Sequence, residues 1–172
     1  MPNTISKKLR AFKIENPNIT EEDSGILSFL SQNLKETSTA QVRRMKLNEE
    51  DEDEDLLSNF SIQPTFLFGM MLRIIPSENG GIIPDNKFSQ KTISIAELNS
   101  KDKKSSQYKD HYYFAINNKY IVTDLSSLYS IDRLQTYLNW LLSSFGIKTI
   151  PKFPDNIKEI MKIAKAPKSV VF

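Results

Sequence analysis

Residues 111–124 read HYYFAINNKYIVTD, and this stretch decides the fold. Two runs of β-forming residues flank Asn117 and Asn118, which tolerate the positive φ angles of a two-residue hairpin turn. Alternation along the first run directs Tyr112 and Phe114 to one face and the residue between them to the other. The segment therefore predicts an antiparallel β-hairpin with one face turned toward a core.

Further strands are predicted on both sides of the hairpin. The most apolar stretch of the chain, TFLFGMMLRII at 65–75, is short, rich in β-forming residues and bounded by prolines. These features favour a central strand over a helix, with Gly69 marking a bulge. Weaker alternation predicts strands at 7–15, 41–47 and 91–98, and the polar, basic residues 101–109 are interpreted as a connector.

Three segments place apolar residues at helical spacing. The clearest covers 131–145, where Ser130 is positioned to cap the first turn and Gly146 follows the last. The other two helices are expected over 21–35 and 155–165. Together with the strands they predict an α+β fold, in which a mostly antiparallel sheet containing the hairpin is packed by two or three helices.

The composition excludes several classes of chemistry. The chain of 172 residues has no cysteine and a single histidine, so disulfide folds, thiol catalysis, iron–sulfur clusters and cysteine-built zinc sites are excluded. No apolar run approaches the ~20 residues that span a bilayer, and the first residues lack the apolar core of a secretory signal. These features predict a cytoplasmic protein with no membrane partner.

The charges are distributed unevenly along the chain. Overall, 23 basic side chains stand against 21 acidic ones, but seven of the acids form one unbroken run at 49–55. Without that run, the remaining residues carry 23 basic and 14 acidic side chains, a net charge of +9. Because seven adjacent like charges repel one another, we expect the run to form a solvated loop.

This loop divides the chain into three parts. We expect an N-terminal strand–helix–strand segment over 1–48, the acidic loop over 49–61 and an α+β core over 62–172. The last four residues, SVVF, have the pattern of a beginning strand, and natural chains seldom stop on an unpaired apolar edge. The chain is therefore predicted to be the N-terminal part of a longer protein.

No set of residues assembles a recognisable catalytic or metal site. His111 is the only possible imidazole base, and the spacing reveals no partner set around it and its neighbour Asp110. The contiguous acids lack the alternation and the glycine of a calcium loop. Pro-Asp at 84–85 followed by Asp-Lys-Lys at 102–104 loosely imitates a two-metal nuclease. We therefore predict no catalytic residue, metal or cofactor, and a metal-dependent nuclease stays as a third alternative.

The basic side chains indicate a polyanion as partner. They cluster in the 41–47 strand, in the 101–109 connector and along one face of the 155–165 helix, and such clusters bind phosphates by releasing counterions. A solvated lysine face that maintains solubility is the alternative interpretation. The predicted nucleic-acid-binding residues are Arg43, Arg44, Lys101, Lys103, Lys104, Lys158, Lys162 and Lys165.

The leading hypothesis is a non-enzymatic module that binds nucleic acid, most simply DNA, through phosphate contacts without base readout. In this hypothesis the acidic loop competes with the polyanion, so deletion of 49–55 would strengthen binding. The rival is a protein-interaction or oligomerisation domain, in which Trp140 on the broad apolar helix contacts a partner or a second copy. Arg73, within the apolar strand, must pair with an acid such as Glu78 or Glu97, or with a phosphate.

The order of elements between about 65 and 142 resembles the N-terminal part of RexA-like phage-exclusion proteins and similar phage-defence families. The resemblance rests on the apolar strand FLFGMMLRI, the strand TISIAEL, the hairpin HYYFAINNKYIVTD and a helix opening with SIDRLQ. It covers under half of the chain, and it includes no catalytic motif. It implies a cytoplasmic defence protein of a bacterium or prophage that binds DNA non-specifically, and it assigns no functional residue.

Overall fold

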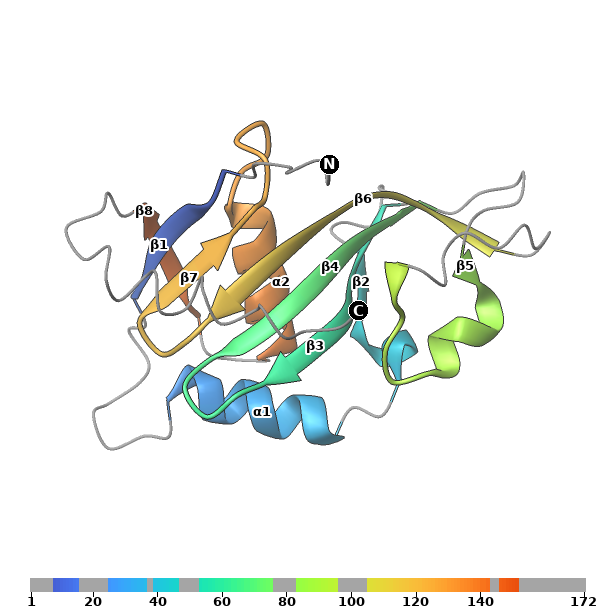
Figure 1. The fold of residues 1–172 in the computed structure, drawn as a ribbon, viewed down its shortest axis with the longest axis horizontal. Coiled ribbons are helices and arrows are strands. Elements are labelled where there is room, and N and C mark those ends of the chain that lie inside the picture. The colour runs from blue at the N-terminus through green and yellow to red at the C-terminus, as the bar shows by residue number, and fades with distance from the viewer. Residues whose placement is uncertain are drawn as a thin grey trace, which may run out of the picture.

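An antiparallel sheet forms the centre of the fold, and two helices pack against one of its faces (Figure 1). The predicted α+β architecture with an antiparallel sheet is confirmed. Among the described residues, no helix has the length and apolar character needed to cross a membrane. The structure, a computed structural model, describes residues 8–15, 25–36, 39–46, 53–75, 83–95, 105–142 and 146–151.

The elements follow one another in a strand–helix–strand beginning and a strand-rich remainder. The helices are α1 (Ile26–Glu36) and α2 (Asp132–Leu141), with two short 3-10 helices, η1 (Ala40–Arg43) and η2 (Asp85–Ser89). The strands are β1 (Arg10–Glu15), β2 (Arg44–Lys46), β3 (Glu54–Ile62), β4 (Leu67–Ile75), β5 (Ile83–Pro84), β6 (Ser105–Ile116), β7 (Tyr120–Thr123) and β8 (Lys148–Pro151).

The strand order is β2-β3-β4-β6-β7-β1-β8, and β5 pairs with β6 outside this path. β1 therefore lies between β7 and β8 and pairs antiparallel with both. These two strands come from the opposite end of the described chain. Among the described strands, β2 and β8 lie at the edges of the sheet, and both are short. The N-terminal strand–helix–strand segment thus contributes two strands to the same sheet as the rest of the chain.

The hairpin is formed by β6 and β7, with Ile116 opposite Ile121. Its turn lies one residue later than predicted, because the backbone of Asn117 donates to the carbonyl of Tyr120 at 3.0 Å. The Asn117 side chain accepts hydrogen bonds from the backbone N–H groups of Lys119 and Tyr120, each at 2.8 Å. Asn117 thus stabilises the turn through its side-chain oxygen, which is a common use of asparagine in turns.

The central strand β4 is confirmed, but the prediction of a bulge at Gly69 is wrong. Gly69 pairs in regular register with Phe60 on one side and Phe114 on the other. The glycine is needed for a different reason: a Cβ atom there would lie 2.5 Å from the Phe114 ring and 2.9 Å from Leu57. The register shifts of this sheet occur elsewhere, between Leu57 and Asn59 and between Arg73 and Ile74.

Three other predictions need correction or lie outside the described residues. The prediction of a strand at 91–98 is wrong for 91–95, where the chain is irregular. Ile93 packs there on the second face of the sheet, and its backbone N–H donates to the Ser58 carbonyl at 2.8 Å. The connector predicted at 101–109 is wrong from Ser105 onward, because β6 begins there. The 155–165 helix lies outside the described residues.

Both α-helices were predicted, and both pack on the same face of the sheet. α1 buries Ile26, Leu30 and Leu34, which recur every four residues, and α2 buries Leu134 and Leu138 in the same cluster. These side chains meet the inward face of the hairpin. The main core of the described chain therefore lies between the helices and the sheet.

The second face of the sheet carries two smaller apolar clusters. One lies under η2 and residues 91–95, where Phe88 and Ile93 contact β4 side chains. The other joins Phe68 of β4 to Tyr120 of β7, which are each only 8% exposed. These aromatic side chains contribute to packing and do not present an open surface on which bases could stack.

Candidate functional site

The end of the acidic run is part of the folded sheet. Asp55 is fully buried and Glu54 is 8% exposed, and β3 begins at Glu54. The prediction of an acidic loop over 49–61 is therefore wrong from residue 54 onward, and residues 49–52 lie outside the described residues. The expected repulsion is overcome because each of the last three acids meets an arginine.

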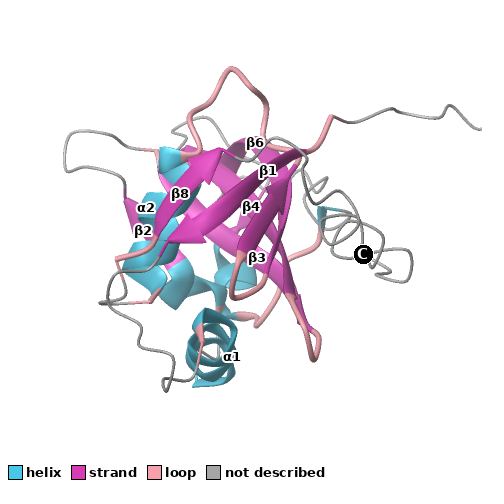
Figure 2. Cartoon of the chain, turned by 90° about the vertical axis from the view of Figure 1, so that its left-hand side faces the viewer, coloured by secondary structure: helices cyan, strands magenta, loops and turns pink. Residues whose placement is uncertain are grey.

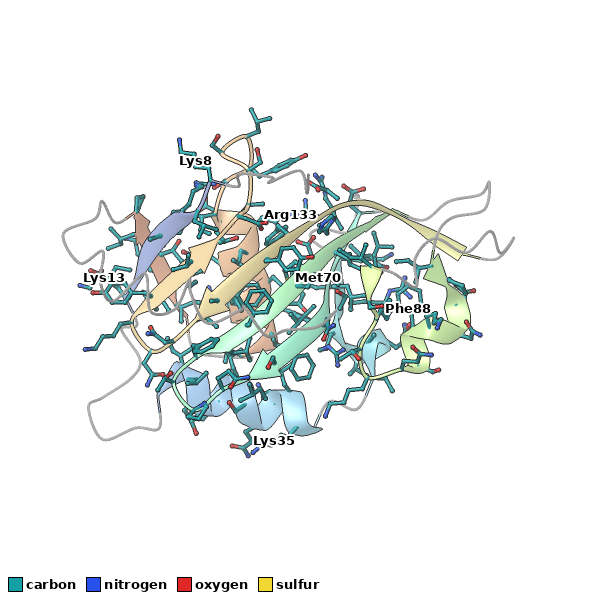
Figure 3. All side chains as sticks on the ribbon, viewed as in Figure 1. Lys8, Lys13, Lys35, Met70, Phe88 and Arg133 are labelled. Atoms are coloured by element: carbon teal, nitrogen blue, oxygen red, sulfur yellow. The ribbon has the colours of Figure 1, made fainter. Side chains whose placement is uncertain are left out.

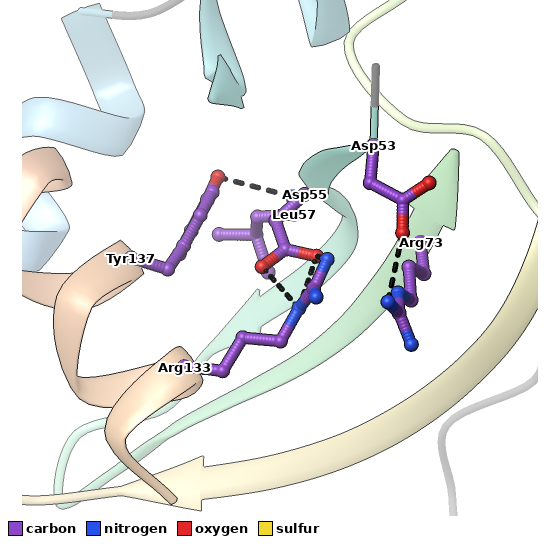
Figure 4. A network of polar contacts seen from close by, with 6 residues as sticks. All are labelled: Asp53, Asp55, Leu57, Arg73, Arg133 and Tyr137. Atoms are coloured by element: carbon purple, nitrogen blue, oxygen red, sulfur yellow. Dashed lines mark hydrogen bonds and ion pairs between the residues drawn. The ribbon is translucent and has the colours of Figure 1, made fainter. Parts of the chain in front are cut away.

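Asp55 is held by Arg133, which lies in the first turn of α2 (Figure 4). The Arg133 Nε donates to both carboxylate oxygens at 3.0 and 2.8 Å, and Nη2 donates to Oδ1 at 2.7 Å. Such bidentate pairing is the strongest geometry available to the two groups. Burial raises the pKa of the Asp55 carboxyl, and the hydrogen bonds from Arg133 oppose that shift.

The other two acids pair with arginines on neighbouring strands. Asp53 accepts from Nη2 of Arg73 at 2.7 Å, and Glu54 accepts from Nε of Arg44 at 2.5 Å. Because side chains alternate along a strand, Glu54 and Asp55 point to opposite faces of the sheet. Arg73 thus finds an acid, as its apolar surroundings require, and that acid lies in the run that was expected to stay in solvent.

Arg43 is buried completely and is part of the core. It donates to three backbone carbonyls, those of Leu57 at 2.9 Å, Thr39 at 3.1 Å and Lys91. The buried Tyr137 hydroxyl donates to the Arg43 carbonyl at 2.8 Å and accepts from the Leu57 N–H at 3.0 Å. The prediction that Arg43 contacts nucleic acid is wrong, because no ligand can reach its guanidinium in the folded protein.

All five arginines of the sequence make contacts inside the molecule. Arg44, which was also predicted to bind nucleic acid, pairs with Glu54 and covers the Phe88 ring at 4.3 Å. Arg10 donates from Nη1 to the backbone carbonyls of Ser126 and Tyr129. Contacts to an external anion therefore depend mainly on lysines. The five are Arg10, Arg43, Arg44, Arg73 and Arg133.

Exposed lysines outnumber exposed acids among the described side chains. The acids that are exposed are Glu15, Asp85 and Asp132. The predicted contacts Lys101, Lys103, Lys104, Lys158, Lys162 and Lys165 lie outside the described residues. The exposed lysines are Lys8, Lys13, Lys35, Lys46, Lys91, Lys119 and Lys148.

Four of these lysines gather at one side of the sheet, which we call the basic edge: Lys8, Lys13, Lys119 and Lys148. They lie just before β1, on β1, in the β6–β7 turn and on β8. The strands β1 and β8 lie on the side that faces the viewer in Figure 2. Figure 3 labels Lys8 and Lys13 there. One acid, Glu15, lies among them and is 3.6 Å from Lys13.

The remaining predicted features have simpler surroundings. His111 lies edge-on to Tyr113, with 5.7 Å between the ring centroids, and is half-buried. The described residues contain no group of three potential metal ligands. Trp140, the predicted interaction residue, is 41% exposed on α2, and its ring lies 5.5 Å from that of Tyr137.

No protein-family model matches the chain, and no curated protein matches it.

The network around Asp55 includes a buried phenol, that of Tyr112. Tyr112 is 5% exposed, and its hydroxyl has no hydrogen-bond partner among the described residues. Burial raises the pKa of this phenol far above its usual value of about 10, and the Asp55 charge adds to the shift. The native state therefore keeps the phenolic proton at a pH where the unfolded chain releases it.

Replacing Tyr112 with Phe should leave stability at pH 7 unchanged or raise it by up to about 1 kcal/mol, because the change removes a buried hydroxyl that makes no hydrogen bond within the described part of the chain. In the wild type, the free energy of unfolding should fall by about 1.4 kcal/mol per pH unit from this phenol alone as the pH rises above about 10. The Tyr112→Phe variant should lack this contribution to the pH dependence of its free energy of unfolding. Urea unfolding at pH 7 and pH 11 measures both effects, with Tyr129→Phe as the half-buried control. A loss above about 1 kcal/mol at pH 7 would contradict the prediction.

Proposed function

We propose that the protein binds nucleic acid through lysine contacts to the phosphate backbone, without reading base sequence. One observation carries the proposal: every arginine is engaged inside the molecule, whereas the exposed cations of the described chain are lysines, four of them on the basic edge. The unequal exposure of lysines and acids gives this side of the sheet a positive field.

The choice of lysine over arginine defines the mode of binding. The guanidinium of arginine presents a rigid fork that recognises guanine in the major groove, and this is the commonest specific contact to DNA. The ammonium of lysine is a compact point charge that binds a phosphate without fixing orientation. Affinity then comes from counterion release and falls steeply with salt. Duplex DNA, a cytoplasmic location and a role in phage defence, which the sequence resemblance implies, are parts of the same proposal.

A gel-shift titration of a duplex at 50 and 200 mM salt tests the proposal. If the four basic-edge lysines each contact a phosphate, affinity should fall by about 100-fold between these salt concentrations. The triple variant Lys13→Ala, Lys119→Ala and Lys148→Ala should reduce the slope of log affinity against log salt by about 3. Lys8 stays intact in this variant.

The matched control removes the same charge from other surfaces, through Lys35→Ala, Lys46→Ala and Lys91→Ala. It should leave most of the salt slope in place. If the two triple variants have equal salt slopes, binding depends only on the net charge of the protein. The basic edge would then not be the binding surface. Absence of binding by the wild type at 50 mM salt would refute nucleic-acid binding itself.

Exposed apolar side chains beside β2 favour protein interaction as a second candidate. Trp140 is 41% exposed and Val42 is 54% exposed. Tyr137 connects them, because its ring adjoins Trp140 and its hydroxyl binds the carbonyl of Arg43, the residue after Val42. A sheet edge with exposed apolar groups is suited to pairing with another chain. Self-association that Trp140→Ala abolishes, together with absent DNA binding, would favour this candidate.

A further inference from the structure

A hollow lies between the start of β1 and the loop that joins β7 to α2. Its volume is about 240 Å³, and it is lined by Lys8, Arg10, Asp124, Leu125, Ser126 and Ser127. Pockets that enclose a whole drug-sized ligand measure about 300–1,000 Å³. The hollow therefore has room for one charged group and part of what it is attached to.

The loop carbonyls hold the Arg10 side chain in place within this lining. Its Nη1 donates to the carbonyl of Ser126 at 3.2 Å and to that of Tyr129 at 3.1 Å, and the guanidinium lies 5.1 Å from the Phe12 ring centroid. Nη1 thus uses its two N–H groups inside the molecule, and a guanidinium carries three more on Nε and Nη2. Because the Arg10 side chain is already ordered, it loses less conformational entropy when an anion binds to it.

The other lining groups add one more cation, two hydroxyls and one acid. Lys8 is exposed, and so are both serines. Asp124 is bound to its neighbour in the sheet: its Oδ1 accepts from the Tyr113 N–H at 2.6 Å, and its own N–H donates to the Tyr113 carbonyl at 3.2 Å. These bonds anchor the first residue of the loop to β6 and fix the position of the serines that follow.

We propose that this hollow binds the phosphate monoester of a nucleotide, such as the 5′ end of a nucleic-acid strand. The inference rests on the proposed function and names a second mode of contact. A monoester carries about −1.5 to −2 charges at pH 7 and three free oxygens, which two cations and two hydroxyls can meet. The Asp124 carboxylate in the same lining opposes the anion, but its Oδ1 is directed to the Tyr113 N–H. An internal phosphodiester has one charge and continues on both sides, so it suits the exposed lysines of the basic edge better than a hollow.

The residue that follows the two serines supports a nucleotide over inorganic phosphate. Leu128 is 90% exposed, and its N–H is bound to Ser126 Oγ at 3.3 Å. Its apolar side chain therefore extends into solvent beside Ser127, where it can contact the sugar or base attached to a bound phosphate. A sugar or base that contacts Leu128 would remove part of this apolar side chain from water, which inorganic phosphate cannot do.

Two duplexes that differ only in a 5′-phosphate or a 5′-hydroxyl test the inference by fluorescence anisotropy with the full chain at 50 mM salt. The phosphorylated duplex should bind about tenfold more tightly to the wild type. Lys8→Ala should abolish this preference, and it should weaken the binding of the 5′-hydroxyl duplex only as much as the loss of any one lysine of the basic edge does. Lys13→Ala, which removes the same charge from β1, should keep the preference.

Equal binding of both duplexes by the wild type would overturn the inference and leave the proposed function standing. A preference that survives Lys8→Ala would also overturn it, because the monoester would then bind elsewhere. If neither duplex binds, titration with adenosine 5′-monophosphate decides: amide shifts at Ser126 and Ser127 that Lys8→Ala removes would support the hollow, and their absence would refute it. Competition by the mononucleotide against the phosphorylated duplex distinguishes a free nucleotide from a strand end.

Discussion

Replacing Asp55 with Asn should lower the free energy of unfolding by about 3 kcal/mol. The change removes the negative charge that compensates Arg133, and breaking a buried pair from one side costs about 3–5 kcal/mol. The lower end applies because the Arg133 side chain remains 15% exposed, whereas Asp55 is 0% exposed. Urea unfolding at pH 7 measures the loss.

Two further variants test whether charge pairing is the cause. Asp85→Asn removes an acid that is exposed on η2, so stability should change by less than about 0.5 kcal/mol. The double variant Asp55→Leu and Arg133→Met should recover most of the lost stability, since apolar residues of similar size often replace a buried ion pair without cost. If Asp55→Asn unfolds at the same urea concentration as the wild type, the pair of Asp55 and Arg133 does not stabilise the folded protein.

The Asp55 contact changes how the acidic run can be tested. Deletion of 49–55 would remove three carboxylates that pair with Arg44, Arg73 and Arg133, so the deleted protein would lose stability before any effect on polyanion binding could be measured. The hypothesis that acids compete with nucleic acid for the basic surface is therefore confined to Glu49–Glu52. Substituting these four by Gln keeps the paired acids and tests it cleanly.

Replacing Arg43 with Met should also lower the free energy of unfolding by at least about 3 kcal/mol. The variant keeps much of the side-chain volume but leaves three carbonyls without their donor, and a buried unsatisfied group costs about 1–3 kcal/mol. Arg43→Lys should recover little, because one ammonium cannot reach carbonyls on three separate segments. Chemical unfolding measures both variants, with Lys46→Met on adjacent β2 as the exposed control.

The same variant separates a structural from a binding role for Arg43. At temperatures where Arg43→Met stays folded, its affinity for duplex DNA should equal that of the wild type. A stable variant with weakened DNA binding would instead restore Arg43 as a phosphate contact and would show that its carbonyl bonds break when DNA binds.

Features specified by local sequence were predicted well. The hairpin, β4 and both described α-helices follow from alternation or helical spacing within single segments, and these signals do not depend on distant residues. The prediction of a strand at 91–98 is wrong over the described residues 91–95, because the alternation there reflects burial of Ile93 against the second face of the sheet, and burial alone does not supply a strand to pair with. A period-2 pattern shows which side chains are buried but does not show what covers them.

The acidic run was misread because two of its arginine partners are distant in sequence. Arg133 is separated from Asp55 by 78 residues, and Arg73 is separated from Asp53 by 20. Arg43 and Arg44 were misread for another reason: their partners Leu57 and Glu54 lie only 14 and 10 residues away, but the pattern of residues does not show that β3 turns back beside them. Nothing in a contiguous run of acids indicates that its last members will enter a strand. One signal was available: the segment after the run, LLSNFSI at 56–62, is rich in apolar and β-forming residues, so a strand could have been extended back into the acids.

The position of β1 has a consequence for how the chain folds during synthesis. β1 pairs with β7 and β8, whose residues lie over 100 positions further along the chain, so these contacts have a high sequence separation and form slowly. On the ribosome, residues 10–15 leave the exit tunnel before either partner strand has been made, so β1 cannot pair until more than 100 further residues have followed it. Until they pair, β7 exposes an unpaired edge in the growing chain, which is an aggregation hazard. We therefore expect the pairing of β1 with β7 and β8 to form late in folding.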